Sequence, residues 1–149
     1  MDIETMERDL RKGMDIEEIL DSVDWKGFED FCAEVFERHS WTVKRNLRFK
    51  TSRRYEIDIV ATKGRLAIAA DCKHWGMRPG KVAGLRNAAK MQSERAEELP
   101  LSERDFGDKK VYPILITLFQ EDITKEDGVW IVPAYRLNSF LLDFEGYLE

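Results

Sequence analysis

Two carboxylates and one amine interrupt a pair of apolar segments in YEIDIVATKGRLAIAADCKHW, residues 55–75. Asp58 lies among isoleucines and a valine in the first segment, and Asp71 and Lys73 close the second. Burying an unpaired ion costs several kcal/mol, so charges in such strands need partners or a chemical task. We therefore consider two explanations, a catalytic site and a structural ion-pair network at one end of a sheet.

The alternation of side chains along a strand predicts which of these groups face one another. Asp71 and Lys73 are two residues apart, so they share one face with two small alanines that leave space above it. On the preceding strand, Asp58 is expected to point to the same side as Glu56. Neighbouring strands lie ~4.8 Å apart, so Asp58 and Asp71 can converge on one point with Lys73 beside them.

Two carboxylates at this spacing suit a divalent cation. Mg²⁺ binds oxygen ligands, usually one or two carboxylates together with waters and phosphate oxygens of a substrate. A lysine beside such an ion can orient or deprotonate an attacking water and offset the charge that builds up on phosphorus. The three residues therefore predict metal-dependent hydrolysis of a phosphate ester, with Mg²⁺ or Mn²⁺ as cofactor.

The hydrophobic periodicity predicts the elements that must position this group. Asp24 is a good N-cap, and the apolar residues that follow it recur every three or four positions, which predicts a helix. Lys63-Gly64 joins the two apolar segments as the turn of a hairpin. We expect short amphipathic helices over 2–23 broken near Gly13, a helix over 24–38, strands over 41–49, 55–62 and 65–73, a helix over 81–98, strands over 110–119 and 128–133, and a closing helix over 136–144.

This order of elements predicts an α/β fold. A central mixed β-sheet is expected to be flanked by helices, with a short N-terminal helical extension. A chain of 149 residues is long enough for one domain with a substantial core. We expect an acidic helical extension over residues 1–23 and the main domain over residues 24–149.

The net charge of −5 argues against a nucleic-acid partner, but the charge is unevenly distributed. Residues 1–24 contain nine acidic and three basic residues, so the rest of the chain is close to neutral. The segment KRNLRFKTSRR, residues 44–54, has no acidic residue, and such a strip attracts phosphates or is simply a solvated strand edge. Its bases are predicted to contact DNA: Lys44, Arg45, Arg48, Lys50, Arg53 and Arg54.

Several classes of protein do not fit the sequence. No apolar run approaches the ~18 residues that a membrane helix needs, and the acidic N-terminus is unlike a signal peptide. Cys32 and Cys72 make neither a disulfide framework nor a zinc site of usual spacing, so we interpret both as core thiols. We find no glycine-rich phosphate loop and no dinucleotide fingerprint, so no nucleotide cofactor is expected. A cytoplasmic protein without a membrane partner fits best.

The charged residues also match a known family. Asp58, a twelve-residue gap and then Asp71-Cys72-Lys73 resemble the PD-(D/E)XK signature of restriction-endonuclease-like nucleases. DWKGFEDFCAEVFERHSWTV resembles the opening helix of the Mrr-type restriction and Holliday-junction-resolvase-like branch. VYPILITLF and GVWIVPAYRLNSFL resemble the closing strands and helix of that branch, so the likeness covers roughly residues 24–144.

This resemblance implies a restriction-endonuclease-like core and a role for each charged residue. Asp58 and Asp71 would bind the metal directly, the Cys72 main-chain carbonyl would add a ligand, and Glu29 would act through water. Lys73 would position the nucleophile. The resemblance implies a metal-dependent DNA endonuclease of the restriction or repair/resolvase type that leaves a 5′-phosphate and a 3′-hydroxyl.

The chain departs from the family pattern at three positions. Glu56 stands where the branch usually has glycine, Ile57 replaces the proline of the signature, and Asp71 is shorter than the residue of many relatives. These differences concern metal geometry and substrate more than the fold. We expect Glu56 to be an ion-pair partner of Arg53 or Arg54 rather than an additional metal ligand.

The segment after the catalytic motif is a second candidate DNA contact. Trp75, Met77 and Arg78 lie in a loop that contains glycine and proline, and Lys81 follows it. Base stacking and phosphate contacts would explain this mixture, and so would ordinary loop packing. His74 is expected either to touch the substrate or to cap the strand.

Two further interpretations stay open. In the first, the chain is a non-catalytic DNA-binding or assembly module that holds phosphates with residues 44–54 and with Arg78, Lys81, Arg86 and Lys90. If the charges of the strands instead formed a structural ion-pair network, Glu29 would be a surface residue of its helix. The second concerns the C-terminal segment LNSFLLDFEGYLE, residues 137–149, which is more apolar than one helix stripe requires. It is predicted either to form a homodimer contact or to belong entirely to the core of its own subunit.

Overall fold

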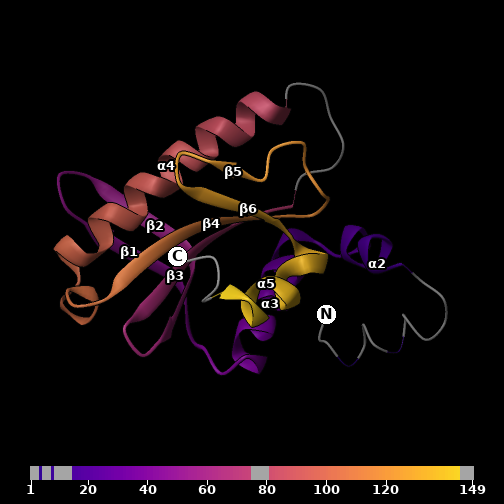
Figure 1. Cartoon of the computed structure of the whole chain (residues 1–149), viewed down its shortest axis with the longest axis horizontal. Coiled ribbons are helices and arrows are strands. Elements are labelled where there is room, and N and C mark those ends of the chain that lie inside the picture. The colour runs from indigo at the N-terminus through magenta and orange to yellow at the C-terminus, as the bar shows by residue number, and fades with distance from the viewer. Residues whose placement is uncertain (1–3, 5–7, 9–14, 75–80, 145–149) are drawn as a thin grey trace.

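A computed structural model of the chain describes residues 4, 8, 15–74 and 81–144, without the side chains of residues 16 and 81 (Figure 1). The described residues form a six-stranded mixed sheet with helices on both faces, which confirms the predicted α/β architecture. The elements are α2 (Ile16–Ser22), α3 (Trp25–Arg38), β1 (Thr42–Lys50), β2 (Arg54–Lys63), β3 (Leu66–Lys73), α4 (Lys81–Ser102), η1 (Arg104–Phe106), β4 (Lys110–Thr117), β5 (Lys125–Glu126), β6 (Val129–Pro133), η2 (Ala134–Arg136) and α5 (Leu137–Leu142).

The strand order β1-β2-β3-β4-β6-β5 brings the ends of three parallel strands to one edge. β1, β2 and β3 form an antiparallel meander, whereas β3, β4 and β6 run parallel and β5 closes the sheet antiparallel. Lys73 pairs with Thr117, which pairs with Pro133. The carboxyl ends of β3, β4 and β6 are therefore neighbours, and we call this side the carboxyl edge of the sheet.

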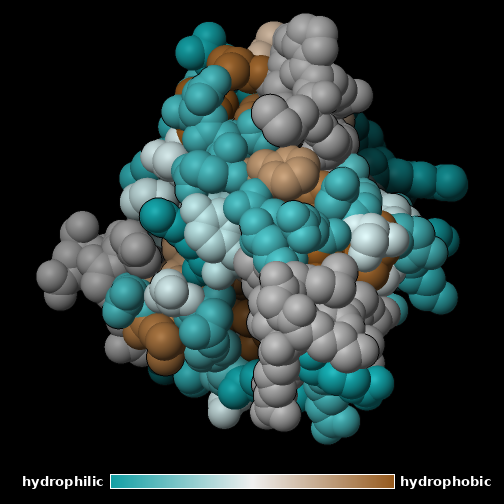
Figure 2. Space-filling model, turned by 90° about the vertical axis from the view of Figure 1, so that its right-hand side faces the viewer, coloured by the Kyte–Doolittle hydropathy of each residue, from teal (hydrophilic) through white to brown (hydrophobic). Residues whose placement is uncertain are grey.

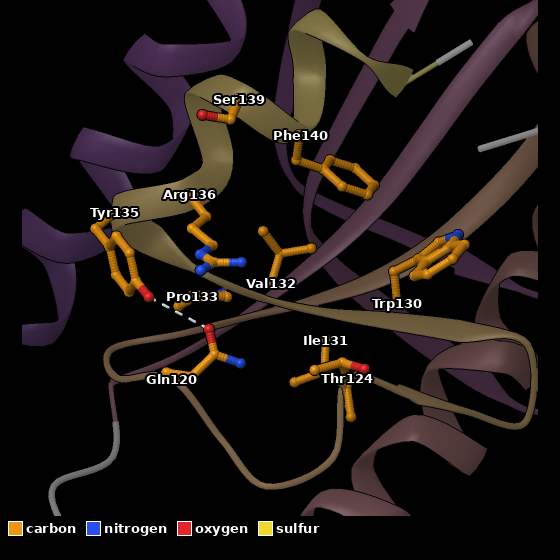
Figure 3. A pocket seen from close by; sticks show the side chains of 10 residues that line it. All are labelled: Gln120, Thr124, Trp130, Ile131, Val132, Pro133, Tyr135, Arg136, Ser139 and Phe140. Atoms are coloured by element: carbon orange, nitrogen blue, oxygen red, sulfur yellow. Dashed lines mark hydrogen bonds between the residues drawn. The ribbon is translucent and has the colours of Figure 1, made fainter. Parts of the chain in front are cut away.

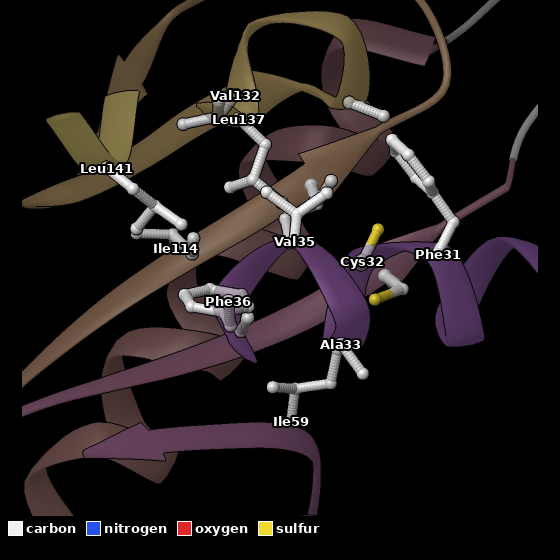
Figure 4. Packing of buried hydrophobic residues seen from close by; sticks show 14 of the residues in the cluster. Phe31, Cys32, Ala33, Val35, Phe36, Ile59, Ile114, Val132, Leu137 and Leu141 are labelled. Atoms are coloured by element: carbon white, nitrogen blue, oxygen red, sulfur yellow. The ribbon is translucent and has the colours of Figure 1, made fainter. Parts of the chain in front are cut away.

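Each face of the sheet has its own apolar core. The apolar stripe of α3 packs with α5 and with the side chains of β2, β3 and β4 that point to the same side (Figure 4). Phe28 and Phe36 are fully buried there, and Ile19 and Leu20 of α2 belong to the same cluster. α4 covers the opposite face, where Leu99 packs against β1, β2 and β3.

Local sequence signals explain where the main elements begin and turn. The Asp24 carboxylate accepts a hydrogen bond of 2.7 Å from the Gly27 amide, which caps α3 as predicted. Gly64 has a φ of +61°, a conformation that glycine adopts without strain, and it forms the predicted turn between β2 and β3. Trp25 was expected on the apolar stripe but is 53% exposed, because it begins the helix outside the packed layer.

Element boundaries differ from the prediction mainly at the ends. α4 continues to Ser102 and contains Pro100 in its last turn, and β4 ends at Thr117 rather than at residue 119. The two-residue strand β5 was not predicted, although Asp127 and Gly128, both with positive φ, form a tight hairpin turn between it and β6. The closing helix is shorter than predicted and follows a 3₁₀ turn. The predicted break near Gly13 lies outside the described residues.

β1 and β2 kink together at Asn46 and Asp58. Ile57 packs on the α4 side of the sheet, whereas Ile59, two residues later, packs on the α3 side. Regular alternation would place both on the same side, so the alternation along β2 breaks at Asp58. Asn46, opposite Asp58, has a φ of +52°, which produces the local change of direction.

None of the described helices is long and apolar enough to cross a membrane. On the end of the molecule seen in Figure 2, the described surface is mostly hydrophilic, with apolar residues in small separate patches.

Candidate active site

The candidate site lies where β2 and β3 separate. The ladder between them runs from the hairpin turn to the pair Ile59 and Ala70 and pairs no residues beyond it. At this fork the Asp58 carboxylate accepts a hydrogen bond of 2.9 Å from the Cys72 amide. The Asp58 side chain thus binds the main-chain amide of the residue that follows Asp71, and this contact places Asp58 beside the end of β3.

Asp71 and Lys73 follow the predicted alternation along β3. The alanines that precede them pack on the α4 side, and the residues between them, such as Cys72, pack on the α3 side. Lys73 Nζ lies 2.7 Å from Asp71 Oδ2 in a partly buried ion pair. The carboxyl groups of Asp58 and Asp71 are close enough to hydrogen-bond when one of them carries a proton. The structure therefore brings these three groups together.

A cleft of about 300 Å³ opens over the two carboxylates. Its walls come from the kinked start of β2, from the end of β3 and from the exposed side of α4. The lining residues are Arg53, Arg54, Tyr55, Glu56, Asp58, Asp71, Met91 and Arg95. The cleft thus combines a carboxylate cluster with three arginines, which is the charge distribution that a phosphodiester and a cation require.

Glu29 faces the same cluster from α3. It is only 2% exposed, and its Oε1 lies 3.3 Å from Arg45 Nη2. Arg45 also contacts Asp30, with 2.6 Å between Nη1 and Oδ1. The second oxygen of Glu29, Oε2, is buried and has no hydrogen-bond partner among the described residues.

Burial and mutual repulsion raise the pKa values of two of these carboxyl groups. Burial, followed by the charge of Asp71 and a hydrogen bond with it, raises the pKa of Asp58 from 3.8 to about 7. Burial also raises the pKa of Glu29, although Arg45 opposes the shift. Without a cation, the cluster therefore tends to hold a proton, as expected for carboxylates that share one site.

The donor set fits a magnesium-type cation with few protein ligands. No three His, Cys, Asp or Glu side chains meet at metal-binding distances within the described part of the chain. Mg²⁺ commonly uses only one or two carboxylates and takes its other ligands from water and substrate. The raised pKa of Asp58 and the unpaired Oε2 of Glu29 are features that a bound cation would relieve.

Most bases of the 44–54 strip have acidic partners within the chain. Arg48 pairs with Glu56 across the two strands, with 3.1 Å between Nε and Oε1, and Lys44 lies 3.7 Å from Asp105. Arg53 pairs with Glu94 of α4. The expectation that Glu56 pairs with Arg53 or Arg54 is therefore wrong, because the strand register places Arg48 directly opposite Glu56.

A groove of about 500 Å³ adjoins the cleft along the hairpin of β1 and β2. Arg54, Tyr55 and Glu56 line both spaces, so the groove continues the cleft. Lys50 lines the groove as well. This part of the basic strip is therefore placed to extend a contact surface away from the carboxylates.

The other predicted DNA contacts have different surroundings. His74 Nε2 lies 3.0 Å from the Leu20 carbonyl oxygen, and its ring packs against Phe28, so it joins α2 and α3 to the end of β3. Arg78 and the side chain of Lys81 lie outside the described residues. Arg86 lies 3.8 Å from Glu126 near the edge strand.

Sequence reasoning missed the contribution of α4 to the cleft. Arg95 lines the cleft and donates to Gln92 Oε1 at 3.0 Å. Gln92 is fully buried and donates to the Ala69 carbonyl oxygen at 2.9 Å, which ties α4 to β3. The signal was present, because Gln92 occupies an apolar-stripe position between Leu85 and Leu99, where a polar residue needs a partner.

A known family matches more than half of the chain. The model of the Mrr catalytic family, described as a restriction endonuclease, matches residues 20–99, which include Glu29, Asp58, Asp71 and Lys73. An uncharacterized protein from Archaeoglobus fulgidus is 27% identical over 125 residues, which cover 83% of this chain and 94% of that protein.

Two crystal structures are similar to the chain at low sequence identity. Protein VC1899 from Vibrio cholerae has a TM-score of 0.49 and 14% identity over 80% of this chain, which spans only 33% of that protein. Protein AF1548, a protein of unknown function, has a TM-score of 0.47 and 18% identity over 76% of this chain and 62% of its own length.

Proposed function

The chain belongs to the restriction endonuclease family that matches residues 20–99, and from this membership we propose that it is a metal-dependent DNA endonuclease that hydrolyses phosphodiester bonds. One observation carries the proposal: Asp58, Asp71 and Lys73 meet at the fork between β2 and β3, and the two carboxylates line a cleft that three arginines also line. In a structural ion-pair network, the arginines would be expected to pair with the two carboxylates. Here Arg53 pairs with Glu94 instead, and Asp58 and Asp71 lie beside each other.

The carboxylates would hold the metal. Asp58 and Asp71 are the proposed direct ligands of Mg²⁺ or Mn²⁺, with the Cys72 carbonyl as a further ligand and Glu29 acting through water. When bound, the cation supplies Lewis-acid stabilisation of the charge on the phosphoryl oxygens. Asp58 is held for this role by its hydrogen bond from the Cys72 amide.

Lys73 would position the attacking water. Its amine is fixed by Asp71 at 2.7 Å, and its side chain is 24% exposed, so it can reach a substrate in the cleft. As an ammonium group it donates hydrogen bonds to the water and to a phosphate oxygen, which offsets negative charge in the transition state. Family resemblance implies products with a 5′-phosphate and a 3′-hydroxyl.

The DNA backbone would follow the cleft and the adjoining groove. Arg54 and Arg95 are the proposed phosphate contacts next to the carboxylates, and Lys50 extends the path along the hairpin. Contacts of this kind bind DNA without reading its sequence and weaken as salt increases.

Nuclease assays with matched variants test the proposal. Plasmid, branched and single-stranded DNA are incubated with Mg²⁺, Mn²⁺ or EDTA and with wild type, Asp58→Asn or Lys73→Ala. We expect either substitution to reduce cleavage by at least ~100-fold, the usual size of one electrostatic catalytic contribution. Lys63→Ala, an exposed lysine at the other end of the same hairpin, should retain activity. Cleavage that persists in Lys73→Ala or in EDTA would refute the assignment.

The non-catalytic DNA-binding or assembly module is the alternative, and one observation favours it. Lys73 pairs with Asp71 and Arg45 pairs with Glu29, so two of the three carboxylates already have cationic partners without a metal. Calorimetric titration with Mn²⁺ distinguishes the two functions. The nuclease should bind Mn²⁺ in a manner that Asp58→Asn weakens, whereas the alternative predicts no binding at this site.

A further inference from the structure

A second pocket, of about 520 Å³, lies at the other side of the carboxyl edge (Figure 3). It is formed by β6, η2, α5 and the segment that follows β4, and it shares no lining residue with the catalytic cleft. Pockets of this size that combine aromatic side chains with a few polar groups are typical of small-ligand sites.

The walls of the pocket combine aromatic rings with polar groups. Tyr135 and Trp130 stand on opposite sides, Phe140 projects from α5, and Arg136 points into the space between them (Figure 3). The Tyr135 hydroxyl donates to Gln120 Oε1 at 3.3 Å, which fixes the amide at the rim. None of the described lining residues is acidic, so the pocket suits a neutral or anionic ligand.

The register of the sheet places this pocket close to the catalytic lysine. Lys73 pairs with Thr117, and Thr117 pairs with Pro133, which lines the pocket. Two strand spacings separate Lys73 from Pro133, a distance of about 10 Å. This corresponds to about three stacked nucleotides along one DNA strand. The cleft opens on the α4 side of the sheet and the pocket on the α5 side, so a strand bound at the cleft would reach the pocket by passing over the carboxyl edge.

We propose that this pocket holds one unstacked nucleobase of the DNA substrate, an inference that rests on the proposed nuclease function. Tyr135 and the Arg136 guanidinium, which lies 5.6 Å from the centre of that ring, provide stacking surfaces for a base, and the Gln120 amide can hydrogen-bond to a base edge. Removing a base from a duplex costs a few kcal/mol, and least where it is already unpaired. The pocket therefore favours substrates with a single-stranded, junction or flap region over a plain duplex.

A coupling experiment tests the proposal directly. Fluorescence anisotropy in EDTA measures binding of single-stranded oligonucleotides in which an abasic site replaces one base at successive positions. For wild type, the abasic site should weaken binding by about tenfold at one position, the effect of losing one stacked base. For Arg136→Ala and Gln120→Ala, that loss of affinity should shrink to less than about twofold, because the pocket no longer stabilises the bound base.

The controls separate this inference from the proposed function. Arg38→Ala removes an exposed arginine whose partner is Glu34, at the far end of α3, and should keep the full abasic penalty. Titration with free dAMP distinguishes a base in DNA from a free nucleotide: tight dAMP binding that Arg136→Ala abolishes, without an abasic penalty, would identify a nucleotide site instead. An equal penalty in wild type and both pocket variants would overturn the inference while cleavage by wild type persists. Absence of DNA binding and of cleavage would overturn the nuclease function itself.

Discussion

Asp58 makes the stability of the metal-free protein depend on pH. Its pKa rises from 3.8 in a free side chain to about 7 in the fold, so the folded state holds a proton that the unfolded chain has released. The stabilisation is fully present below the unfolded pKa and is lost as the pH rises through about 7. As the pH rises from 3.8 to about 7, wild type in EDTA should lose stability relative to Asp58→Asn, whose amide does not titrate.

Thermal unfolding across pH 4–8 measures this difference. The melting temperature of wild type minus that of Asp58→Asn should decrease steadily as the pH rises. Asp108→Asn, an exposed control, should follow wild type. Parallel curves for wild type and Asp58→Asn would show that Asp58 is not held near Asp71 in a buried site.

We expect Arg45 to position Glu29, because it forms an ion pair with that carboxylate. It contacts both Glu29 and Asp30, and Glu29 is almost completely buried. Arg45→Ala leaves that carboxylate without its cation and should lower the free energy of unfolding by about 1–3 kcal/mol. Arg48→Ala, on the same strand, breaks an exposed pair and should cost no more than about 1 kcal/mol. Urea denaturation compares the two, and equal losses would contradict this role.

At the scale of elements, we expect the kink in β1 and β2 to decide where the Asp58 carboxylate lies. Asn46 adopts a φ of +52°, which a β-branched residue adopts only under strain. Asn46→Val should therefore destabilise the protein by about 1–2 kcal/mol, whereas Asn46→Gly should be tolerated. Asn46→Val should also weaken Mn²⁺ binding in calorimetry, because straightening the strand would move Asp58 away from Asp71.

A matched substitution tests whether the change at the kink, and not the valine itself, weakens Mn²⁺ binding. Lys44→Val introduces the same side chain on the same strand, at an exposed position outside the kink. It should leave Mn²⁺ binding unchanged. If Asn46→Val were as stable as wild type and bound Mn²⁺ equally well, the kink would have no role in placing Asp58.

At the scale of the whole molecule, the described residues offer one candidate catalytic cluster, and most apolar side chains of the C-terminal segment are buried. Leu137, Phe140, Leu141 and Phe144 of the C-terminal segment are buried in the core, whereas Leu142 is 69% exposed. Tyr147 and Leu148, which the homodimer prediction also used, lie outside the described residues. The surface in Figure 2 likewise shows only small apolar patches. From the burial of these residues we predict a monomer.

We expect this monomer to cut one DNA strand at a time. Sedimentation at micromolar concentration should give a species of 17.5 kDa, with and without DNA. Supercoiled plasmid should first accumulate as the open circle and only later as the linear form, because one site cleaves one strand. A species of twice the mass together with direct linearisation would instead support the homodimer.

Some features of this protein follow from the sequence alone. The spacing of apolar residues and the N-cap at Asp24 determined α3, and Lys63-Gly64 determined the hairpin of β2 and β3, because these signals are local. The alternation along β3 correctly placed Asp71 and Lys73 on one face. The order of the charged residues also identified the family before any three-dimensional information.

Other features were decided only by the tertiary structure. The kink at Asn46 and Asp58 breaks the alternation that the sequence suggests, because it depends on how two strands twist together. The acidic partners of Arg48 and Arg53 depend on strand register and on the placement of α4. The second pocket arises where β6, α5 and the segment after β4 meet. Ion pairs and cavities depend on distances between segments that are remote in sequence, and no local pattern encodes those distances.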